Sequence, residues 1–465
     1  MIKLTLSKIA EIIDGKLIGA DAVVTGSVET DSRLVGAGAL FFAKPGEVTD
    51  GHNFVESARA SGAVAAVVER LLPEVDLPQI LVTDSVLALG KLAAGVLAQV
   101  RSETGLKVIG VTGSNGKTST KNMLRQVLSR YGKTIAPQES YNNEVGAPIS
   151  ILKIDEETKY LVAELGAGGV GSIEYLAKMT KPDIGVVLKV GLAHVGEFGG
   201  PEVTAQIKAE LVRELSNDAT FIYNLDDGEV ARMTQLTDAE KFSFGTNPDA
   251  DLHYDNVRLS IEGTSADFHF PNGETHEVSL QILGEHQLMN AAATLAVSNI
   301  LGIPTVDAIE ALSELPLAER WRMQLFNLPS GVSVINDAYN ASPDSMKAAL
   351  QTLAAIGRGS RRTIAVLGEM AELGAFSREA HDEIGRLVVR YNIDQLVVVG
   401  EAAKLIHLGA MQEGSWDGES VFFNAGSEAL DYIRGILEPG DIVLVKSSKS
   451  ANLRFLGDDL AEVKS

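Results

Sequence analysis

The sequence predicts an α/β protein of three domains, with a central parallel sheet, an antiparallel meander attached to it, and a second parallel sheet towards the C-terminus. The first observation is length, since 465 residues exceed what a single hydrophobic core usually accommodates. The second is the repeated alternation of short apolar runs of strand length with segments of helical periodicity. The third is a change to polar–apolar alternation within Asp251–Ile282, which is typical of antiparallel strands.

Composition and charge exclude several classes of protein. Apolar residues make up 45% of the chain and the net charge is -22, which argues against nucleic acid or anionic membranes as partners, because those surfaces attract clustered Lys and Arg. The absence of cysteine excludes disulfides, thiolate zinc sites and a cysteine nucleophile. The segment Met1–Gly15 is typical of an amphipathic helix rather than a signal peptide, and the apolar stretches are too short to cross a bilayer. We expect a cytoplasmic protein without membrane insertion.

The first domain is expected over residues 1–103 as a small α/β unit. Ala39–Ala43 and Ala63–Val68 have the length and apolar character of buried strands, and Ser85–Val100 has helical spacing. The polar stretch Arg101–Gly105 is expected to be the linker to the next domain.

The second domain is expected over residues 104–316. Buried strands are predicted at Val108–Val111, Tyr160–Ala163 and Ile184–Leu188, with helices between them, a pattern that indicates a parallel sheet. The alternating segments follow, and a helix from about His286 to Leu301 closes this domain.

The third domain is expected over residues 317–465. Apolar strands again alternate with helical segments, which indicates a doubly wound, Rossmann-like parallel sheet. The expected strands are Val332–Ile335, Thr363–Leu367, Gln395–Val399 and Ile442–Val445.

A glycine-rich loop follows the first strand of the second domain and runs directly into a helical pattern. It reads Thr112-Gly-Ser-Asn-Gly-Lys-Thr118. Its glycines let successive backbone N–H groups face phosphate oxygens, and the helix N-terminus adds partial positive charge. Lys117 would neutralise the β- and γ-phosphates, and the Thr118 hydroxyl would reach Mg²⁺. Val111 occupies the first glycine position of the usual G-x-x-x-x-G-K-[ST] spacing, but the flanking strand and helix favour a P-loop-type central sheet over a plain turn.

This loop resembles the ATP loop of the Mur ligases and of the related folylpolyglutamate synthases, and further strings extend the likeness over essentially the whole chain. Thr30–Arg33, Leu40–Ala43 and Asp50–Phe54 resemble the UDP-binding domain of the later Mur ligases. Asn336–Ser345 and Val366–Gly374 resemble the branch of the family that adds D-alanyl-D-alanine.

The resemblance implies an ATP- and Mg²⁺-dependent ligase of peptidoglycan synthesis. Its substrates would be UDP-N-acetylmuramoyl-tripeptide and D-alanyl-D-alanine, and its products UDP-N-acetylmuramoyl-pentapeptide, ADP and phosphate. The family forms an acyl phosphate on the peptide carboxylate, which the incoming amine then attacks. This chemistry gathers several anionic groups, so metal ions and backbone N–H groups must neutralise charge. The three domains would bind the UDP precursor, ATP and the incoming dipeptide in that order, and a monomer is expected.

Besides Lys117, the resemblance implies three catalytic groups around the metal. Glu164 follows an apolar strand, so it lies at the carboxyl edge of a parallel sheet, where ligands bind in such folds. His194 is implied to lie near a second metal ion. Lys208 lies in a helical pattern that by itself indicates a lysine stem covering apolar surface, but it matches the lysine that is carbamylated in many Mur ligases, and a carbamate is an oxygen ligand suited to Mg²⁺. The implied metal ligands are Thr118, Glu164, His194 and Lys208 as its carbamate.

The resemblance also implies the substrate contacts. Gly284–Asn290 is similar to the adenine-side motif, with Gln287 where asparagine is usual, and Trp321 stands where the family often has glycine before the arginine. The implied ATP-binding residues are Gly113, Ser114, Asn115, Gly116, Lys117, Thr118, Ser119, Asn290, Arg322, Asp337, Tyr339 and Asn340. The implied precursor-binding residues are Ser32, Arg33, Gly51, His52, Asn142 and Asn143.

Three alternatives remain beside this interpretation. A neighbouring, amino-acid-adding Mur ligase is one, although the Asp-Asn-Pro-Arg string of the diaminopimelate-adding enzymes is absent. A folylpolyglutamate synthase is another, against which the UDP-type first domain argues. A catalytically silent nucleotide-binding regulator is the third, and it would be expected to have lost Lys117, Glu164 or Lys208. Whether the third residue of the peptide substrate is lysine or diaminopimelate stays open at this point.

Overall fold

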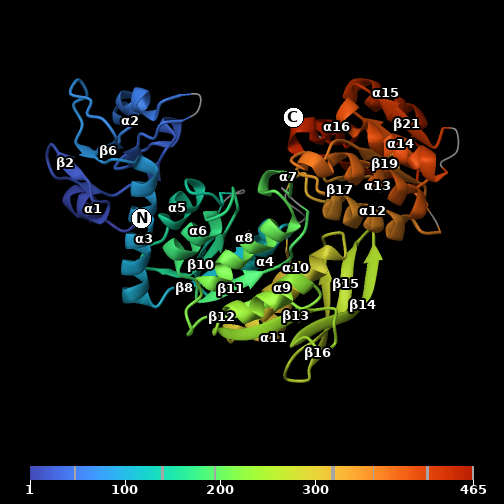
Figure 1. Ribbon diagram of the computed structural model, residues 1–465, viewed down its shortest axis with the longest axis horizontal. Helices are drawn as coiled ribbons and strands as arrows, with labels where there is room; N and C mark the ends of the chain where they lie inside the picture. Colours follow the sequence, from blue (N-terminus) through green and yellow to red (C-terminus); the bar gives the residue numbers. More distant parts are fainter. Residues whose placement is uncertain are drawn as a thin grey trace.

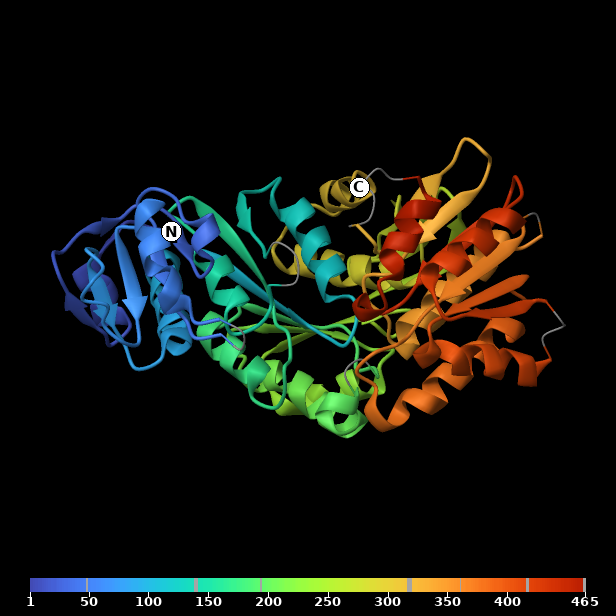
Figure 2. The same ribbon diagram turned by 90° about the horizontal axis from the view of Figure 1, so that it is seen from above.

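The protein folds into three lobes that follow one another along the chain (Figures 1 and 2). The computed structural model describes residues 1–46, 49–137, 141–192, 195–315, 320–359, 361–414 and 418–462. Within these residues each lobe has its own main sheet, of five, nine and six strands. The predicted α/β class with three domains is therefore confirmed.

The first lobe is built on a small, mostly parallel sheet. Its strand order is β2-β7-β6-β5-β4, and only the β2–β7 pair is antiparallel. The strands are β1 (Leu4–Thr5), β2 (Lys16–Ile18), β3 (Val23–Val24), β4 (Val28–Glu29), β5 (Leu40–Phe42), β6 (Ala65–Val68) and β7 (Gln79–Leu81). The helices are α1 (Leu6–Ile12), η1 (Ser32–Leu34), η2 (Gly51–Phe54), α2 (Val55–Ala60) and α3 (Ser85–Thr104). Because β5 and β6 are buried along their whole length, they show the continuous apolar runs by which they were predicted.

Helix α3 connects the first and second lobes without a flexible linker. Its N-cap is Asp84, and the helix runs through Thr104 to Gly105, which adopts a left-handed conformation. The expected linker at Arg101–Gly105 is therefore wrong, since its first four residues are helical. These polar residues lie at the exposed end of the helix, where Arg101 pairs with Asp183 of the second lobe at 2.7 Å.

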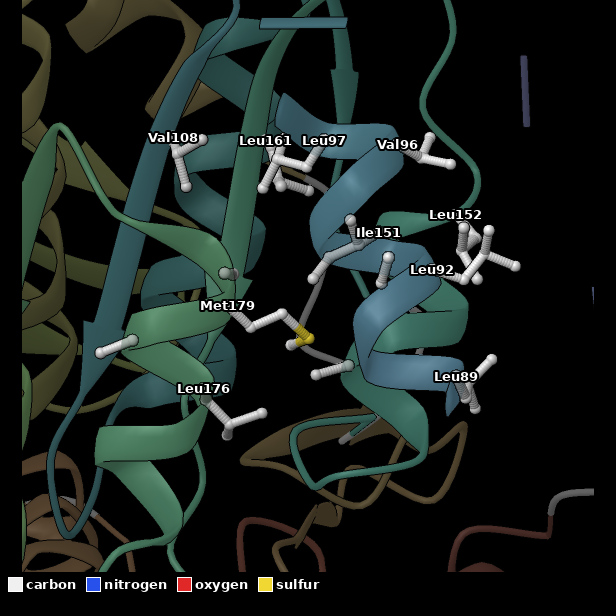
Figure 3. Packing of buried hydrophobic residues seen from close by; sticks show 14 of the residues in the cluster. Leu89, Leu92, Val96, Leu97, Val108, Ile151, Leu152, Leu161, Leu176 and Met179 are labelled. Atoms are coloured by element: carbon white, nitrogen blue, oxygen red, sulfur yellow. The ribbon is translucent and has the colours of Figure 1, made fainter. Parts of the chain in front are cut away.

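The buried face of α3 packs on the second lobe and not only on its own sheet (Figure 3). Leu92 and Val96 of α3 belong to one hydrophobic cluster with Ile151 of α5 and Met179 of α6. This cluster also contains strand residues of both lobes. Burial of this shared apolar surface holds the first lobe on the second.

The second lobe contains the nine-stranded sheet, ordered β16-β15-β14-β13-β12-β11-β8-β10-β9. Strands β8 to β14 pair in parallel with their neighbours, and β14, β15 and β16 form the antiparallel meander that was predicted. The strands are β8 (Lys107–Thr112), β9 (Lys133–Ile135), β10 (Thr158–Glu164), β11 (Ile184–Val187), β12 (Thr220–Asn224), β13 (Glu240–Gly245), β14 (Leu252–Ser260), β15 (Gly263–His269) and β16 (Thr275–Leu280). The helices are α4 (Lys117–Leu128), α5 (Gly146–Ile151), α6 (Ser172–Thr180), α7 (Val195–Phe198), α8 (Pro201–Arg213), α9 (Gly228–Arg232), η3 (Met233–Leu236), α10 (His286–Ile300) and α11 (Thr305–Ser313).

The order of these strands places three loops together. Strand β8 lies between β11 and β10 and is parallel to both, so the chain segments that follow β8, β10 and β11 leave the same edge of the sheet side by side. Strand order reverses at this point, which is where doubly wound sheets bind ligands.

The third lobe is a six-stranded sheet ordered β17-β18-β22-β19-β20-β21. All neighbouring pairs are parallel except β17–β18. Two hydrophobic clusters cover its two faces, one under α12 to α14 and the other under α15 and α16, as expected for a doubly wound sheet. The strands are β17 (Gln324–Asn327), β18 (Ser333–Asn336), β19 (Thr363–Leu367), β20 (Gln395–Val399), β21 (Ser420–Phe423) and β22 (Ile442–Lys446). The helices are α12 (Pro343–Gly357), η4 (Gly374–Phe376), α13 (Ser377–Arg390), η5 (Glu401–Ala403), α14 (Lys404–Glu413), α15 (Gly426–Ile436), η6 (Lys449–Ala451) and α16 (Leu453–Leu460).

Among the described helices, none combines the length and the apolar character needed to cross a membrane.

Candidate active site

The glycine-rich loop lies between β8 and α4 at the edge where strand order reverses. Gly113 and Gly116 both have positive φ, at +151° and +87°, which L-residues with side chains rarely adopt. A Cβ on Gly116 would also lie 2.4 Å from Asn290 Oδ1, so only glycine fits there. The same Asn290 oxygen accepts a hydrogen bond from Thr120 Oγ1 at 3.3 Å. Asn290 of α10 is thus packed onto the loop.

Lys117 is the first residue of α4, and its ammonium lies inside the loop. Nζ donates to the carbonyl oxygen of Gly113 at 2.6 Å and to that of Ser114 at 3.4 Å. Burial lowers the pKa of Lys117, the charge of Glu164 raises it, and that of Arg322 lowers it. The Lys117 amine is therefore held inside the loop by two of the loop's own carbonyl oxygens.

Glu164 is the last residue of β10 and is buried, with an exposed fraction of 1%. Its Oε1 accepts hydrogen bonds from Thr118 Oγ1 at 3.3 Å and from Asn142 Nδ2 at 2.8 Å. Its Oε2 has no hydrogen-bond partner within the described residues and lies 3.9 Å from Lys121 Nζ. A buried carboxylate oxygen without a hydrogen bond calls for a missing ligand, and beside a threonine hydroxyl it fits Mg²⁺.

Lys121 was not predicted as a site residue, yet it is almost completely buried beside Glu164. Its signal in the sequence is its position four residues after Lys117, which places both lysines on one face of α4. Exposed helix lysines share this spacing, so the spacing alone does not single out Lys121.

The remaining implied metal ligands differ in what the structure shows. His194 lies outside the described residues. Lys208 lies on α8 and is 3% exposed, with Nζ 5.9 Å from the ring centroid of Phe198. Burial lowers the pKa of Lys208 well below its usual value; the charge of Lys117 lowers it further, and that of Glu210 opposes this. The structure therefore buries a lysine that its helical pattern alone would place at the surface.

No cluster of three or more His, Asp or Glu side chains that could hold a metal ion occurs in the described part of the chain. Magnesium sites in nucleotide-binding proteins usually need only one or two carboxylates, because phosphate oxygens and water complete the coordination. Thr118 and Glu164 match that pattern.

A cavity of about 200 Å³ lies between the second and third lobes, next to the glycine-rich loop. Both lobes contribute to its walls, as the expected division of the ATP contacts requires. The expected residues that line it are Asn115, Gly116, Ser119, Asn290, Arg322, Asp337, Tyr339 and Asn340. Gly113, Ser114, Lys117 and Thr118 belong to the same loop but do not line this cavity.

The third-lobe wall is held by hydrogen bonds and a cation–π contact. The Arg322 guanidinium lies 4.4 Å from the ring centroid of Tyr339. Asp337 accepts from Lys446 Nζ at 2.5 Å and from the Met323 backbone N–H at 2.9 Å. Lys446 was not predicted. It ends the buried strand β22, and its burial beside Asp337 indicates that it orients this carboxylate.

The two lobes also touch directly beside the cavity. Asp344 in the first turn of α12 accepts from Lys189 Nζ and from the Leu192 backbone N–H, both at 3.1 Å. Ser342 Oγ donates to Asn115 Oδ1 at 3.3 Å. Lys189 and Asp344 both line the cavity, and neither was predicted as a site residue.

His286 and Gln287 begin α10 at the cavity wall. Gln287 Nε2 donates to His286 Nε2 at 3.1 Å, and Gln287 Oε1 accepts from Asn290 Nδ2 at 3.0 Å. Gln287, the residue that departs from the family motif, thus links His286 to Asn290 through its side-chain amide. Burial lowers the pKa of His286 to about 4, an effect that Asp337 opposes and Lys446 reinforces, so the ring is neutral at pH 7.

The implied precursor-binding residues of the first lobe are not brought together with the nucleotide cavity. Arg33 forms an exposed ion pair with Asp31, and Ser32 is its neighbour in η1. His52 is buried; its Nδ1 hydrogen-bonds Asp50 Oδ1 at 2.7 Å and its Nε2 accepts from the Glu69 N–H at 2.9 Å. Both ring nitrogens of His52 therefore already have hydrogen-bond partners within the protein. Gly51 lies against the Lys44 carbonyl oxygen, and a Cβ on Gly51 would be 2.6 Å from that oxygen.

Asn142 lies beside Glu164 in the second lobe, and Asn143 is its neighbour in sequence. Asn142 donates to Glu164, as described above, whereas Asn143 Oδ1 accepts from the Gly146 N–H at 2.8 Å at the start of α5. Both residues line a second cavity of about 420 Å³.

Comparison with known proteins agrees with this geometry. Three protein-family models match this chain. The model of the "Mur ligase middle domain" matches residues 111–298, and that of the "Mur ligase, glutamate ligase domain" matches residues 321–449. The model of the "Mur ligase family, catalytic domain" matches residues 25–96. A UDP-N-acetylmuramoyl-tripeptide–D-alanyl-D-alanine ligase of Mycobacterium tuberculosis H37Rv is 40% identical over 501 aligned residues, covering 99% of this chain and 98% of that one.

Two solved structures extend the comparison to the fold. A crystal structure of MurF from Acinetobacter baumannii has a TM-score of 0.90 and 31% identity, covering 99% of both chains. MurF of Thermotoga maritima in complex with ADP has a TM-score of 0.82 and 28% identity, covering 95% of this chain and 99% of that one. The resemblance read from the sequence is confirmed, and this chain belongs to the Mur ligase family.

Proposed function

We propose that this protein is the Mur ligase that joins D-alanyl-D-alanine to UDP-N-acetylmuramoyl-tripeptide at the expense of ATP. The observation that carries the proposal is the buried oxygen of Glu164 that accepts no hydrogen bond, beside Thr118 and Lys117, next to a cavity whose walls come from two lobes. The relative with 40% identity over 99% of this chain supports the choice of substrates.

The proposed reaction has two steps. The terminal carboxylate of the tripeptide attacks the γ-phosphorus of ATP, which forms an acyl phosphate and releases ADP. The neutral amine of the dipeptide then attacks the acyl carbon, and after loss of the amine proton the tetrahedral adduct expels phosphate and leaves the amide. Lys117 and the loop N–H groups would neutralise the transferring phosphoryl group.

Thr118 and Glu164 would hold Mg²⁺, with His194 and carbamylated Lys208 as further proposed ligands. When bound, the ion would supply positive charge to the phosphate and acyl oxygens. Asn142 donates to Glu164 Oε1, and its role would be to keep Oε2 directed into the site.

The three domains are proposed at residues 1–103, 104–316 and 317–465, and they would bind the UDP precursor, ATP and the incoming dipeptide. Arg322, Asp337, Tyr339 and Asn340 would complete the ATP site from the third domain. We propose a monomer, since one chain contributes both walls of the cavity, and a cytoplasmic location, where ATP and UDP-linked precursors occur.

The test is release of phosphate by the purified protein. UDP-N-acetylmuramoyl-tripeptide and ATP are supplied with D-alanyl-D-alanine, with single amino acids, or with no acceptor. The proposal expects release only with the dipeptide. Equal release with a single amino acid would favour an amino-acid-adding Mur ligase. A further arm supplies ATP with a folate and glutamate, and release there would favour a folylpolyglutamate synthase. No release in any arm would favour a nucleotide-binding regulator.

A further inference from the structure

A second cavity adjoins the reacting centre and shares no lining residue with the nucleotide cavity. It is formed by residues 142–144, by the segment 166–168 after β10, and by the start of α6. Asn142 belongs to its wall and donates to Glu164. The Gly166 N–H donates to the Asn142 carbonyl oxygen at 2.9 Å, which ties the two wall segments together.

The position of this cavity indicates what enters it. Under the proposed function, the carboxylate that becomes the acyl phosphate belongs to the third residue of the peptide and must lie beside Glu164 and Lys117. The side chain of that residue branches from the carbon next to this carboxylate, so it leaves the reacting centre within a few ångströms. With ATP in the nucleotide cavity, the space behind Asn142 is where this side chain can extend.

The helix N-terminus in the cavity wall is already occupied by a carboxylate of the protein. Glu210 of α8 is buried, and its two oxygens accept from the Gly171 N–H at 2.7 Å and from the Glu174 N–H at 3.0 Å. These are two of the N–H groups at the start of α6, and the carboxylate also lies at the positive end of the helix dipole. Glu210 therefore neutralises this end of the helix.

The charge that faces the cavity is negative. Among the described residues that line it, Glu144 is the one acidic or basic side chain, and it is exposed. Tyr175 of α6 lies in the same wall. Burial raises the pKa of Tyr175, and the charges of Glu144 and Asp84 raise it further, which is consistent with two carboxylates on this side of the ring.

We propose that this cavity binds the side chain of the third peptide residue and selects one that ends in an ammonium group alone over one that also ends in a carboxylate. Glu144 attracts the ammonium, and it repels a second carboxylate that the neutralised end of α6 does not compensate. The preferred substrate therefore carries a lysine-type diamino acid at this position. The inference rests on the proposed ligase activity.

The test compares two UDP-N-acetylmuramoyl-tripeptides, one with L-lysine and one with meso-diaminopimelate, at saturating ATP and D-alanyl-D-alanine. We expect kcat/KM to be roughly tenfold or more higher for the lysine form, with most of the difference in KM, because the charges act on binding. A diaminopimelate form whose distal carboxylate is amidated should approach the lysine form. The preference should weaken in high salt, because Glu144 is exposed.

Glu144→Gln should bring the two kcat/KM values to within about threefold, and Glu144→Lys should favour the diaminopimelate form. Glu240→Gln, at an exposed position on β13, is the matched control and should keep the wild-type preference. Equal or better turnover of the diaminopimelate form by the wild type, or an unchanged preference in Glu144→Lys, overturns the inference while leaving the ligase activity standing. No product from either tripeptide overturns the proposed function itself.

Discussion

Lys189 and Asp344 form an ion pair of 3.1 Å that links the second and third lobes at the nucleotide cavity. Lys189 follows β11, and Asp344 lies in the first turn of α12, 155 residues further along the chain. A Cβ on Gly191 would lie 2.4 Å from Asp344 Oδ2, so the segment after β11 approaches α12 as closely as its backbone allows. The relative position of the two lobes therefore depends on this carboxylate.

Asp344→Asn should loosen the contact between these lobes. The amide keeps the size of the side chain but loses the negative charge of the carboxylate. That charge attracts Lys189 and strengthens the hydrogen bond from the Leu192 N–H. Small-angle scattering without nucleotide should show a larger radius of gyration than for the wild type. An ATP analogue with the UDP precursor should compact the wild type further, because the site is complete only when both walls meet. Identical radii for variant and wild type in both states would show that Asp344 does not hold the lobes together.

Lys117→Ala should abolish turnover and leave the fold intact. Loss of a cation beside the transferring phosphoryl group costs on the order of 3–4 kcal/mol of transition-state stabilisation, or a few hundredfold in rate. Phosphate release measures the effect, and circular dichroism checks the fold. Lys91→Ala is the control, since Lys91 is exposed and pairs with Asp14. Retention of more than about a tenth of the activity would contradict the phosphate-loop assignment.

Lys208 should carry a carbamate. Because burial holds its pKa well below the usual value, its neutral amine is available to add to CO₂, and the product loses a proton to become a carbamate. Protein equilibrated with ¹³C-bicarbonate should show a carbamate carbon signal that is absent from Lys208→Ala and present in the exposed-site control Lys153→Ala.

Lys208→Ala should also lose most activity, and small carboxylates in the buffer should partly restore it by occupying the vacated ligand position. Lys208→Arg should not be restored, because the guanidinium keeps its charge and fills the space. Near-normal activity of Lys208→Ala without bicarbonate would contradict the carbamate and show that Lys208 only packs within the fold.

His286 should make the protein less stable below pH 6.5. Its pKa is about 4 in the folded protein against an ordinary 6.5, so the unfolded chain binds the proton first as the pH falls. Stability linked to this group is complete above pH 6.5 and is lost progressively down to about pH 4, by up to roughly 3 kcal/mol. Urea unfolding of the wild type and of His286→Asn at several pH values isolates the contribution of His286 to the pH dependence of the free energy of unfolding. A stability difference between the two proteins that does not change with pH would contradict it.

Gly90→Ala should destabilise the contact between α3 and α6. A Cβ at this position would lie 1.8 Å from the Tyr175 hydroxyl, and such overpacking costs about 1–3 kcal/mol, against a gain of about 1 kcal/mol in helix propensity. Tyr175→Phe removes that oxygen, and the next ring atom is 3.0 Å away. Denaturant unfolding should therefore show the double variant to be more stable than the sum of the single effects predicts.

The buried parallel strands could be predicted because residues on both of their faces are apolar. β19 and β20 were predicted at their observed bounds, Thr363–Leu367 and Gln395–Val399. The edge strand β17 was missed, since Gln324–Asn327 is only partly buried and begins and ends with amide side chains. The linker at Arg101–Gly105 was predicted wrongly because its polar residues continue an amphipathic helix whose buried face contacts a distant part of the chain.

Lys117, Glu164 and Asn290, which the structure brings together around the glycine-rich loop, could be proposed from the sequence because a motif surrounds each of them. Lys121, Lys189 and Lys446 are single lysines in helical or strand-end patterns, which ordinarily indicate surface. Their contacts are with Glu164, Asp344 and Asp337, all more than forty residues away in sequence. Only the folded chain shows these pairs.

The packing of α3 on the second lobe constrains how such proteins can evolve by domain exchange. A crossover placed in the chain just before Lys107 would transfer α3 with its own lobe but separate it from Ile151 and Met179, against which it packs. A foreign helix would present side chains of different shape to these residues, and it could carry a residue larger than Gly90 opposite Tyr175. We therefore expect recombination at this boundary to give a stable protein only between close relatives, or where α5 and α6 are inherited together with α3.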